Sequence, residues 1–394
     1  MLTVPTGQAA TGMTGWVPRV CLVSHRLGGR DGVSVEAAKW AAGFSGLGWP
    51  VTRAAGLFTD HQAGDVTVTG LWAQRPGEPP PPVDHDVVRA LVATHDLVVL
   101  DNVGSLPSAP LAARAWQDAV LAAARPMIVR HHDPAWAAMP DDHPPATLLP
   151  LHHPGHLHAT INQAMYTQFA RRWPELLHAD ALRVVHNRVD VATLAAGGDR
   201  AGVRAAMGVA DAELLLVHPA RAVARKNIPA AVRFARRLAE LSPRPVRYWL
   251  TAEDSPTSDD GPLVPLIPAA LAQAPGGALR GSIPRPADMY AAADLVVLPS
   301  TWEGWGLPVV EAAAAGRPVV AGPYPVLGEI RAHGVRVYDP QEVDTVSDLL
   351  RHPARRAREL AANRNAVTRH FDAAALPGQL RELASQARRL AGAA

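Results

Sequence analysis

Short apolar runs recur along the whole chain, and each is followed by a loop rich in glycine or charge and then by a helical pattern. The clearest runs are Arg19–His25, Asp96–Leu100, Pro126–Arg130, Glu213–His218, Pro245–Thr251 and Leu295–Leu298. Runs this short and this continuously apolar are typical of strands buried on both faces of a parallel sheet. The pattern therefore predicts doubly wound α/β domains, which bind ligands at the carboxyl ends of their strands.

The alternation restarts once, and this divides the chain. Arg183–Asp190 reads as a strand running into a turn, and a polar stretch through Gly202 then suits an interdomain connection. We expect an extension without structure over 1–18, a first domain over 19–188, a second domain over 189–370 and a helical tail over 371–394. A chain of 394 residues that is 48% hydrophobic is long enough for two such domains.

Composition excludes several classes of protein. A formal net charge of +2 gives no reason to expect nucleic acid as a partner, and no run of like charges marks a membrane surface. No stretch reaches the length of a transmembrane segment, and Met1–Pro18 lacks the features of a signal peptide. The single cysteine, Cys21, cannot form an internal disulfide, which favours a reducing compartment and a cytoplasmic location.

The richest stretch for chemistry is the loop after Leu295–Leu298. It reads PSTWEGWGLPVVEAAAAGRPVVAG over 299–322, so Gly304 and Gly306 precede a helix that carries Pro308 and Glu311 in its expected first turn. Gly316 is the expected helix end, and Pro318–Val320 the next strand. Glycines let backbone N–H groups approach a ligand closely, and a helix N-terminus favours phosphate.

Two carboxylates accompany this loop. Glu303 and Glu311 would repel a phosphate, so we expect them to accept hydrogen bonds from neutral hydroxyls, such as those of a sugar and a ribose. Taken singly, each also fits a simpler role: Glu303 as a solvated loop residue and Glu311 as a complement to the helix dipole.

Two cations flank an earlier loop of the second half. Arg221 and Lys226 lie between the strand run Glu213–His218 and a helical run that begins at Pro229. Both can converge near that helix N-terminus and hold a diphosphate there. Solvated surface cations are the alternative.

The first half offers two further loops at strand ends. Gly28, Gly29 and Asp31 lie in LGGRDG, which is not the dinucleotide fingerprint GxGxxG and weakens a dehydrogenase interpretation. A plain tight turn is the alternative there. His131 and His132 end the run Pro126–Arg130, where an imidazole can donate to a sugar hydroxyl or manage a proton. The sequence leaves open which ring faces the ligand.

A second group of histidines invites a metal interpretation. His152, His153, His156 and His158 are close in sequence, but Pro154 and Gly155 break any helix that would align them, and no cysteine–histidine zinc pattern is present. We expect these rings to lie in loops and predict no metal ligands.

The loop and its partners resemble a known family. Glu-Gly-aromatic-Gly-Leu-Pro, with a second glutamate eight positions after the first, is similar to the signature of glycosyltransferase family 4, although Trp305 stands where Phe is commoner. That family contains retaining, nucleotide-sugar-dependent enzymes of the two-domain GT-B fold.

The resemblance implies roles for individual residues. Arg221 and Lys226 match the pyrophosphate-binding pair, Glu303 the sugar contact, Glu311 the ribose contact, and Gly304, Trp305, Gly306 and Leu307 the donor loop. Gly28 and Gly29 match a loop near the donor phosphate or the acceptor, His132 a histidine beside the donor sugar, and Ser282 with Ile283 the segment along the base.

On the acceptor side the implied residues are Asp31, His131 and Asn187. Arg188 replaces the glycine of the family's Pro-Asn-Gly-Val-Asp turn, and we expect it to add a cation facing the acceptor. In GT-B folds a tail such as 371–394 crosses back onto the first domain.

The predicted function is transfer of a hexose from a nucleotide diphosphate sugar to an acceptor hydroxyl, with retention and a same-face mechanism. Arg221, Lys226, Glu303 and His132 are the predicted catalytic residues, and no cofactor or metal is expected besides the nucleotide-sugar co-substrate. The acceptor is expected to be a small molecule or glycan, with a lipid left open. Two alternatives remain: a GT-B epimerase or phosphorylase, and a non-catalytic subunit that binds nucleotide sugars.

Overall fold

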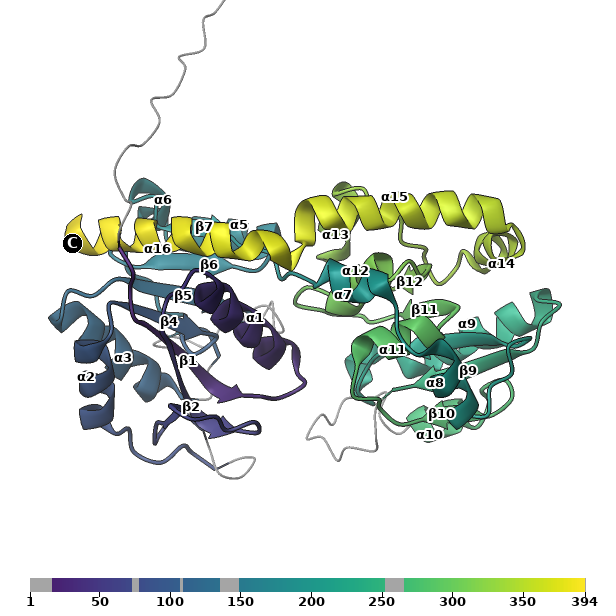
Figure 1. The fold of residues 1–394 in the computed structure, drawn as a ribbon, viewed down its shortest axis with the longest axis horizontal. Helices are drawn as coiled ribbons and strands as arrows, with labels where there is room; N and C mark the ends of the chain where they lie inside the picture. The colour runs from purple at the N-terminus through teal and green to yellow at the C-terminus, as the bar shows by residue number, and fades with distance from the viewer. Residues whose placement is uncertain (1–15, 73–77, 107–108, 135–148, 252–265, 394) are drawn as a thin grey trace, which may run out of the picture.

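The chain folds into two α/β domains that lie side by side and are bridged by the helices at the end of the chain (Figure 1). The computed structural model describes residues 16–72, 78–106, 109–134, 149–251 and 266–393. Both sheets are parallel throughout, and together the domains form the two-domain α/β architecture that the apolar pattern predicts.

The first domain is built on a sheet of order β3-β2-β1-β4-β5-β6-β7. Its elements are β1 (Val20–Leu27), α1 (Gly32–Gly46), β2 (Val51–Phe58), β3 (Val66–Thr67), α2 (His85–Thr94), β4 (Leu97–Asp101), α3 (Pro110–Ala122), β5 (Met127–His131), β6 (Leu157–Thr160), α5 (Gln163–Arg172), α6 (Glu175–His178) and β7 (Leu182–Val184).

The second domain is built on a smaller sheet of order β10-β9-β8-β11-β12. Its elements are α7 (Val191–Ala196), α8 (Arg200–Ala206), β8 (Leu214–His218), the 3₁₀ turn η1 (Ala224–Lys226), α9 (Ile228–Leu241), β9 (Val246–Leu250), α10 (Leu266–Leu271), β10 (Ala278–Arg280), α11 (Pro286–Ala292), β11 (Leu295–Leu298), α12 (Leu307–Ala314), β12 (Val319–Ala321), α13 (Leu327–Ala332), α14 (Val343–Arg351) and α15 (Pro353–Phe371).

The central strands are buried along their whole length. Every residue of β4, β5, β8 and β11 is buried, because helices cover both faces of each sheet. This explains why these strands appear in the sequence as continuous apolar runs instead of alternating ones. The six clearest predicted runs coincide with β1, β4, β5, β8, β9 and β11 to within two residues, and the predicted fold class is confirmed.

The tail of the chain ties the domains together. α15 lies over the second domain, and α16 (Leu376–Ala393) lies over the first, with the short turn η2 (Ala373–Ala375) between them (Figure 1). Leu376, Leu380 and Leu383 of α16 join Trp40 and Phe44 of α1 in one buried cluster. The break between the two helices is at Asp372, and Pro377 occupies the first turn of α16, where proline is tolerated.

The chain crosses between the domains twice, and the two crossings are hydrogen-bonded to each other. Val189 N donates to Phe371 O at 2.9 Å, and Ala373 N donates to Val189 O at 2.8 Å. Arg188 donates to Asp372 O at 2.9 Å and to Gln379 Oε1 at 2.9 Å. Arg188 therefore fastens the first crossing to the second and to α16, and the expectation that it faces the acceptor is wrong.

The N-terminal extension falls in two parts. Residues 1–15 of the predicted extension lie outside the described residues. Trp16 is described, and its ring lies 5.9 Å from that of Trp49 and under the guanidinium of Arg388 at 5.0 Å. The packed first domain therefore begins two to three residues before the predicted boundary.

Candidate active site

The loop between β11 and α12 is shaped by glycine. Gly306 has φ +95°, and a Cβ placed on it would lie 2.1 Å from the hydroxyl oxygen of Tyr324, so only glycine fits. Pro308 lies in the first turn of α12, and Gly316 follows its end with φ +65°, as predicted. Glu311 lies beyond the first turn of α12, so its predicted place in that turn is wrong.

Two cations pair with the buried carboxylate of Glu303, and a third cation lies in the same loop. Lys226 Nζ lies 2.5 Å from Glu303 Oε1, and Arg225 Nη1 lies 3.3 Å from Oε2. Arg221 is exposed at the start of the same loop. Burial lowers the pKa of Lys226, Glu303 opposes this shift, and Arg225 and Arg221 add to it. Two cations on one carboxylate, with Arg221 in the same loop, leave a local excess of positive charge.

Arg225 supports the site between its two loops. Its guanidinium lies 5.3 Å from the ring centroid of Trp302, and Nη1 donates to Trp302 O at 3.3 Å. Thr301 N donates to Arg225 O at 2.9 Å, so η1 and the loop after β11 are joined through their backbones. Arg225 thus holds the two loops of the second domain together.

Glu311 is oriented by a tyrosine. Tyr290, fully buried on α11, donates its hydroxyl to Glu311 Oε2 at 2.7 Å. Burial raises the pKa of the Glu311 carboxyl, and Lys39 of the first domain opposes this shift. Local sequence pattern did not reveal Tyr290, because its contact with Glu311 depends on how α11 and α12 pack.

On the first-domain side, His132 is held by the end of β4. Its Nε2 lies 2.7 Å from Asp101 Oδ1, and its backbone N–H donates to Asn102 Oδ1 at 3.1 Å. Burial by itself raises the pKa of Asp101, but Arg130 and His132 outweigh it and leave the carboxyl ionised more readily than usual. Asp101 ends an apolar strand run, the signal by which it could have been found.

The two candidate histidines are separated by the fold. His131 is completely buried, with Ser105 Oγ at 2.6 Å from Nδ1 and His158 Nδ1 at 3.1 Å from Nε2. Burial holds the pKa of His131 well below its ordinary value, and the nearby histidines add to the shift. His131 does not face the cleft, and the acceptor-side expectation for it is wrong, whereas His132 lines a pocket.

That pocket is formed by both domains. Its lining includes His132, Asn162, Gln168, Trp302, Glu303 and Gly304. Asn162 Nδ2 donates to Gly304 O at 2.9 Å, and a Cβ on Gly304 would lie 3.6 Å from His132 O. The carboxyl ends of the two sheets therefore meet here, and Asn162, the N-cap of α5, is another contact that the sequence did not reveal.

An ion network lies behind His132. Arg130 is completely buried and donates to Glu36 Oε2 and to Asn187 Oδ1, each at 2.8 Å. Its Nη1 lies 3.6 Å from Asp101 Oδ2, and Lys39 Nζ lies 2.6 Å from Glu36 Oε1. Asn187 is therefore buried in this network, and its predicted acceptor-side position is not observed.

The remaining predicted residues lie around the cleft. Gly28 has φ +80°, and a Cβ there would lie 2.6 Å from Asp60 N. A Cβ on Gly29 would lie 2.7 Å from Asp31 Oδ2. Asp31 caps α1 by accepting from Ser34 N at 3.2 Å, and its acceptor role remains a prediction.

The predicted base contacts lie on the second-domain rim. Ser282 Oγ accepts from Arg30 Nη1 of the first domain at 3.3 Å, so this segment lies opposite the glycine loop. Ile283 is partly buried against the core of the second domain. Their contact with a base remains a prediction.

The histidines of 152–158 are more buried than expected. His156 and His158 lie in the interior, and burial lowers their pKa values to about 3 and about 4. The predicted loop positions are correct for His152, His153 and His156, but His158 belongs to β6.

The fold and one stretch of sequence place the protein in a class. Two facing parallel-sheet domains with a bridging tail form the GT-B arrangement, and residues 279–361 match the family described as Glycosyl transferases group 1. This stretch contains the loop with Glu303 and Glu311, whereas Arg221 and Lys226 precede it. Among the described residues, no helix combines the length and apolar character needed to cross a membrane.

Particular proteins are similar to this chain. A D-inositol 3-phosphate glycosyltransferase of Kribbella flavida is 34% identical over 146 residues, which cover 36% of this chain and 34% of that protein. The O-antigen chain mannosyltransferase B of Escherichia coli is 44% identical over 59 residues, which cover 15% of this chain and 16% of that protein. The chain thus matches about a third or less of these relatives' length.

One solved structure illustrates the fold. Anabaena HepE in complex with UDP-glucose superposes with a TM-score of 0.69 at 19% identity, covering 93% of this chain and 99% of that one. At this identity the likeness shows the GT-B fold.

Proposed function

We propose that the protein is a retaining glycosyltransferase that moves a hexose from a nucleotide diphosphate sugar to an acceptor hydroxyl. The observation that carries the proposal is the pocket in which Glu303, with its surplus of cations, faces His132 of the other domain. The group 1 match and the GT-B fold support the same class of reaction.

The cations suit a leaving diphosphate. Lys226 and Arg221 would stabilise the charge that develops as the bond between the sugar and the phosphate breaks, together with N–H groups of 304–307. A diphosphate can replace Glu303 as the partner of Lys226. Glu303 would then be released to accept from sugar hydroxyls, with Glu311, oriented by Tyr290, accepting from the ribose.

The reaction step needs no carboxylate nucleophile. The bond from the anomeric carbon to the phosphate oxygen breaks, and the acceptor oxygen bonds to the same face of that carbon. The acceptor proton passes to the departing phosphate oxygen. His132, fixed by Asp101, would donate to the donor sugar or hold a proton beside it. The protein cations take the role that a divalent metal has in other transferases, so we propose that transfer requires no metal.

The relatives suggest which substrates to try first. HepE was solved with UDP-glucose, and the Kribbella relative is a D-inositol 3-phosphate glycosyltransferase. We therefore propose a uridine donor and a small polyhydroxylated or glycan acceptor as the first pair to test. The buried thiol of Cys21 agrees with the proposed cytoplasmic location.

The test combines binding and turnover. UDP-, GDP-, ADP- and TDP-sugars are screened by thermal shift, and the best donor is then incubated with an acceptor panel in the presence of EDTA. NMR of the product should show the anomeric configuration of the donor. Inverted product, or turnover that EDTA abolishes and Mg²⁺ restores, would contradict the mechanism.

Donor incubated without acceptor separates the alternatives. An epimerase makes a new sugar nucleotide under these conditions, and a phosphorylase releases sugar phosphate when inorganic phosphate is added. A non-catalytic subunit binds the donor but does not turn it over with any acceptor in the panel.

A further inference from the structure

Three side chains that can bind metal meet beside the crossing between the domains. His186 follows β7 of the first domain, Glu329 lies on α13 of the second, and His333 caps α13. One ligand atom from each lies within 4.8 Å of the others, and His186 Nε2 lies 2.6 Å from Glu329 Oε1. This is the one group of three or more such residues in the part of the chain that the structure describes.

The helix brings two of the three ligands together. Glu329 and His333 are four residues apart, which places their side chains on one face of α13. His186 approaches this face from the other domain. A bound cation would therefore join the two domains directly.

The carboxylate is already positioned by the first domain. Gln163 N, at the start of α5, donates to both carboxylate oxygens of Glu329, at 3.0 and 2.9 Å. The imidazole of His186 stacks on Trp305 with ring centroids 4.8 Å apart and planes at 23°. Both side chains therefore have little freedom to move away from the cluster.

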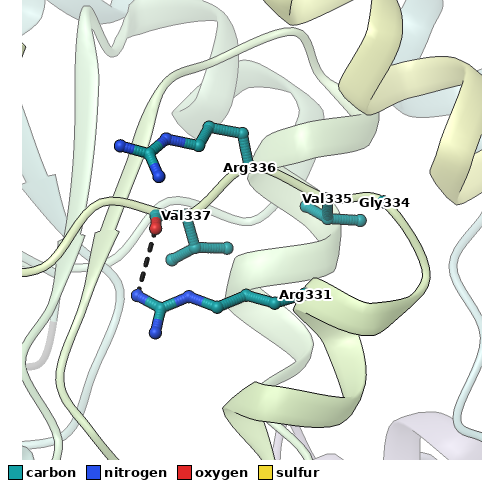
Figure 2. A pocket seen from close by; sticks show the side chains of 5 residues that line it. All are labelled: Arg331, Gly334, Val335, Arg336 and Val337. Carbon is teal, nitrogen blue, oxygen red and sulfur yellow. Dashed lines mark hydrogen bonds between the residues drawn. The ribbon is translucent and has the colours of Figure 1, made fainter.

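The turn that carries His333 is also held in place. Figure 2 shows Arg331 reaching across this turn, where its Nη2 donates to Val337 O at 3.1 Å. Arg336 N donates to Asn363 Oδ1 of α15 at 2.7 Å. The His333 ring itself lies 4.6 Å from His370 and 5.2 Å from Phe371.

Two imidazoles and one carboxylate are a ligand set for zinc. Zn²⁺ accepts His₂Glu sets with water as the fourth ligand, and ligand atoms around it are about 3.3 Å apart. The three residues are half-buried, so rotation of their side chains can shorten the distances between the ligand atoms, and water still has access to the site.

We propose that His186, Glu329 and His333 form a binding site for a divalent transition-metal ion, with Zn²⁺ as the expected occupant. The ion replaces the His186–Glu329 hydrogen bond and fixes the first domain to α13. Because His186 stacks on Trp305, it also restrains the loop that carries Glu303. The site is separate from the proposed transfer reaction and acts on the relative position of the domains.

The test uses the full chain after EDTA treatment and dialysis. Co²⁺ titration should give visible d–d absorption of a tetrahedral or five-coordinate site that saturates at one ion per chain, and Zn²⁺ should abolish it. Zn²⁺ should also raise the apparent melting temperature. Absence of saturable d–d absorption in the unmodified protein overturns the proposal without reference to any variant.

Variants assign the ligands. His333→Gln and His186→Gln should each weaken Zn²⁺ binding about tenfold or more, measured by competition with a chromogenic chelator. His153→Gln is the matched control, since His153 lies 4.8 Å from His156 in the other histidine group. Circular dichroism of the metal-free variants checks that each folds.

Two results overturn the assignment. Equal Zn²⁺ affinity in the unmodified protein and both ligand variants means that the triad is only a hydrogen-bonded cluster. A loss confined to His153→Gln places the ion in the first domain. Neither outcome depends on whether the protein transfers sugar, because the readout is metal binding.

Discussion

The charged side chains near the carboxyl end of the first sheet differ in balance from those near the carboxyl end of the second. In the first domain two cations, Lys39 and Arg130, face two carboxylates, Glu36 and Asp101, and all but Lys39 are buried. In the second domain Lys226 and Arg225 share the single carboxylate of Glu303, and Arg221 adds a third cation to the same loop. The first set balances internally, and the second does not.

The difference separates architecture from binding. Buried charges are tolerated when partners satisfy them, so the first set fixes β4, β5 and α1 around His132 and the crossing. An unbalanced set attracts an anionic ligand, because the protein's own carboxylate neutralises the cations only in part and a negative group of the ligand can pair with them. We therefore expect substitutions in the first set to change mainly stability, and those in the second mainly binding and rate.

The largest effect is expected from a substitution that unbalances the charged set of the first domain. Asp101→Asn removes one of its carboxylates and leaves Arg130 undercompensated in the interior, so it should lower the free energy of unfolding by about 3 kcal/mol. Urea denaturation measures this. Asp118→Asn, which breaks an exposed pair with Arg114, should change stability by less than about 1 kcal/mol. Equal losses of unfolding free energy in the two variants would contradict the structural role given to the buried, balanced charges.

The second test breaks the unbalanced set. Lys226→Ala should reduce kcat/KM roughly 100-fold, because a cation aimed at the departing diphosphate is lost. Arg237→Ala removes an exposed cation paired with Glu240 on α9 and should leave the rate unchanged. Steady-state kinetics with the best donor decides, and near-normal turnover by Lys226→Ala means that the diphosphate lies elsewhere.

Acidification should affect the first domain more than the second. Burial lowers the pKa of His156 and His218 to about 3 and of His158 to about 4, below the unfolded value. The unfolded chain then binds more protons, so stability is lost as pH falls below about 6.5, by roughly 1.4 kcal/mol per group at pH 5.5.

His156 and His158 belong to the first domain and His218 to the second. Amide hydrogen exchange, corrected for intrinsic rates, should therefore show a larger loss of protection in β5 and β6 than in β8 between pH 7 and 5.5. A larger loss in β8 contradicts this expectation.

The smallest effect is expected from a substitution of Arg221, the exposed cation of the second-domain set. Arg221 is exposed, so solvent screens its interaction with a diphosphate, and Arg221→Ala should weaken donor binding about tenfold or less. Calorimetric titration with the donor nucleotide measures it. If Arg221→Ala loses as much donor affinity as Lys226→Ala, solvent exposure does not determine how much each cation contributes to binding.

Local pattern was enough for the fold. Continuous apolar runs located β1, β4, β5, β8, β9 and β11 but not β2, β3 or β6, and glycines at 306 and 316 marked the limits of α12. Strand burial and backbone conformation act on neighbouring residues, so local sequence can reveal them. The same local signals drew attention to Lys226, Glu303 and His132, whose roles remain predictions. His132 follows β5 directly, and Glu303 lies in the loop that follows β11, so the position of each along the chain is set by a neighbouring strand.

Long-range pairing could not be predicted in this way. Tyr290 meets Glu311, and Glu36 meets Arg130, only because helices and strands far apart in sequence pack together. Arg188 seemed free to face an acceptor, but the returning chain supplies Asp372 and Gln379 as its partners. A charged residue near a predicted cleft therefore does not reveal whether the protein already satisfies it.

The most direct test compares a nucleoside diphosphate with its nucleoside. The diphosphate that gives the largest thermal shift and the matching nucleoside are titrated calorimetrically into the unmodified protein and into Lys226→Ala. If the unbalanced cations hold the diphosphate, it should bind the unmodified protein about 100-fold more tightly than the nucleoside, and Lys226→Ala should remove most of that difference. Equal affinities for the two ligands, or a difference that survives Lys226→Ala, would contradict the account.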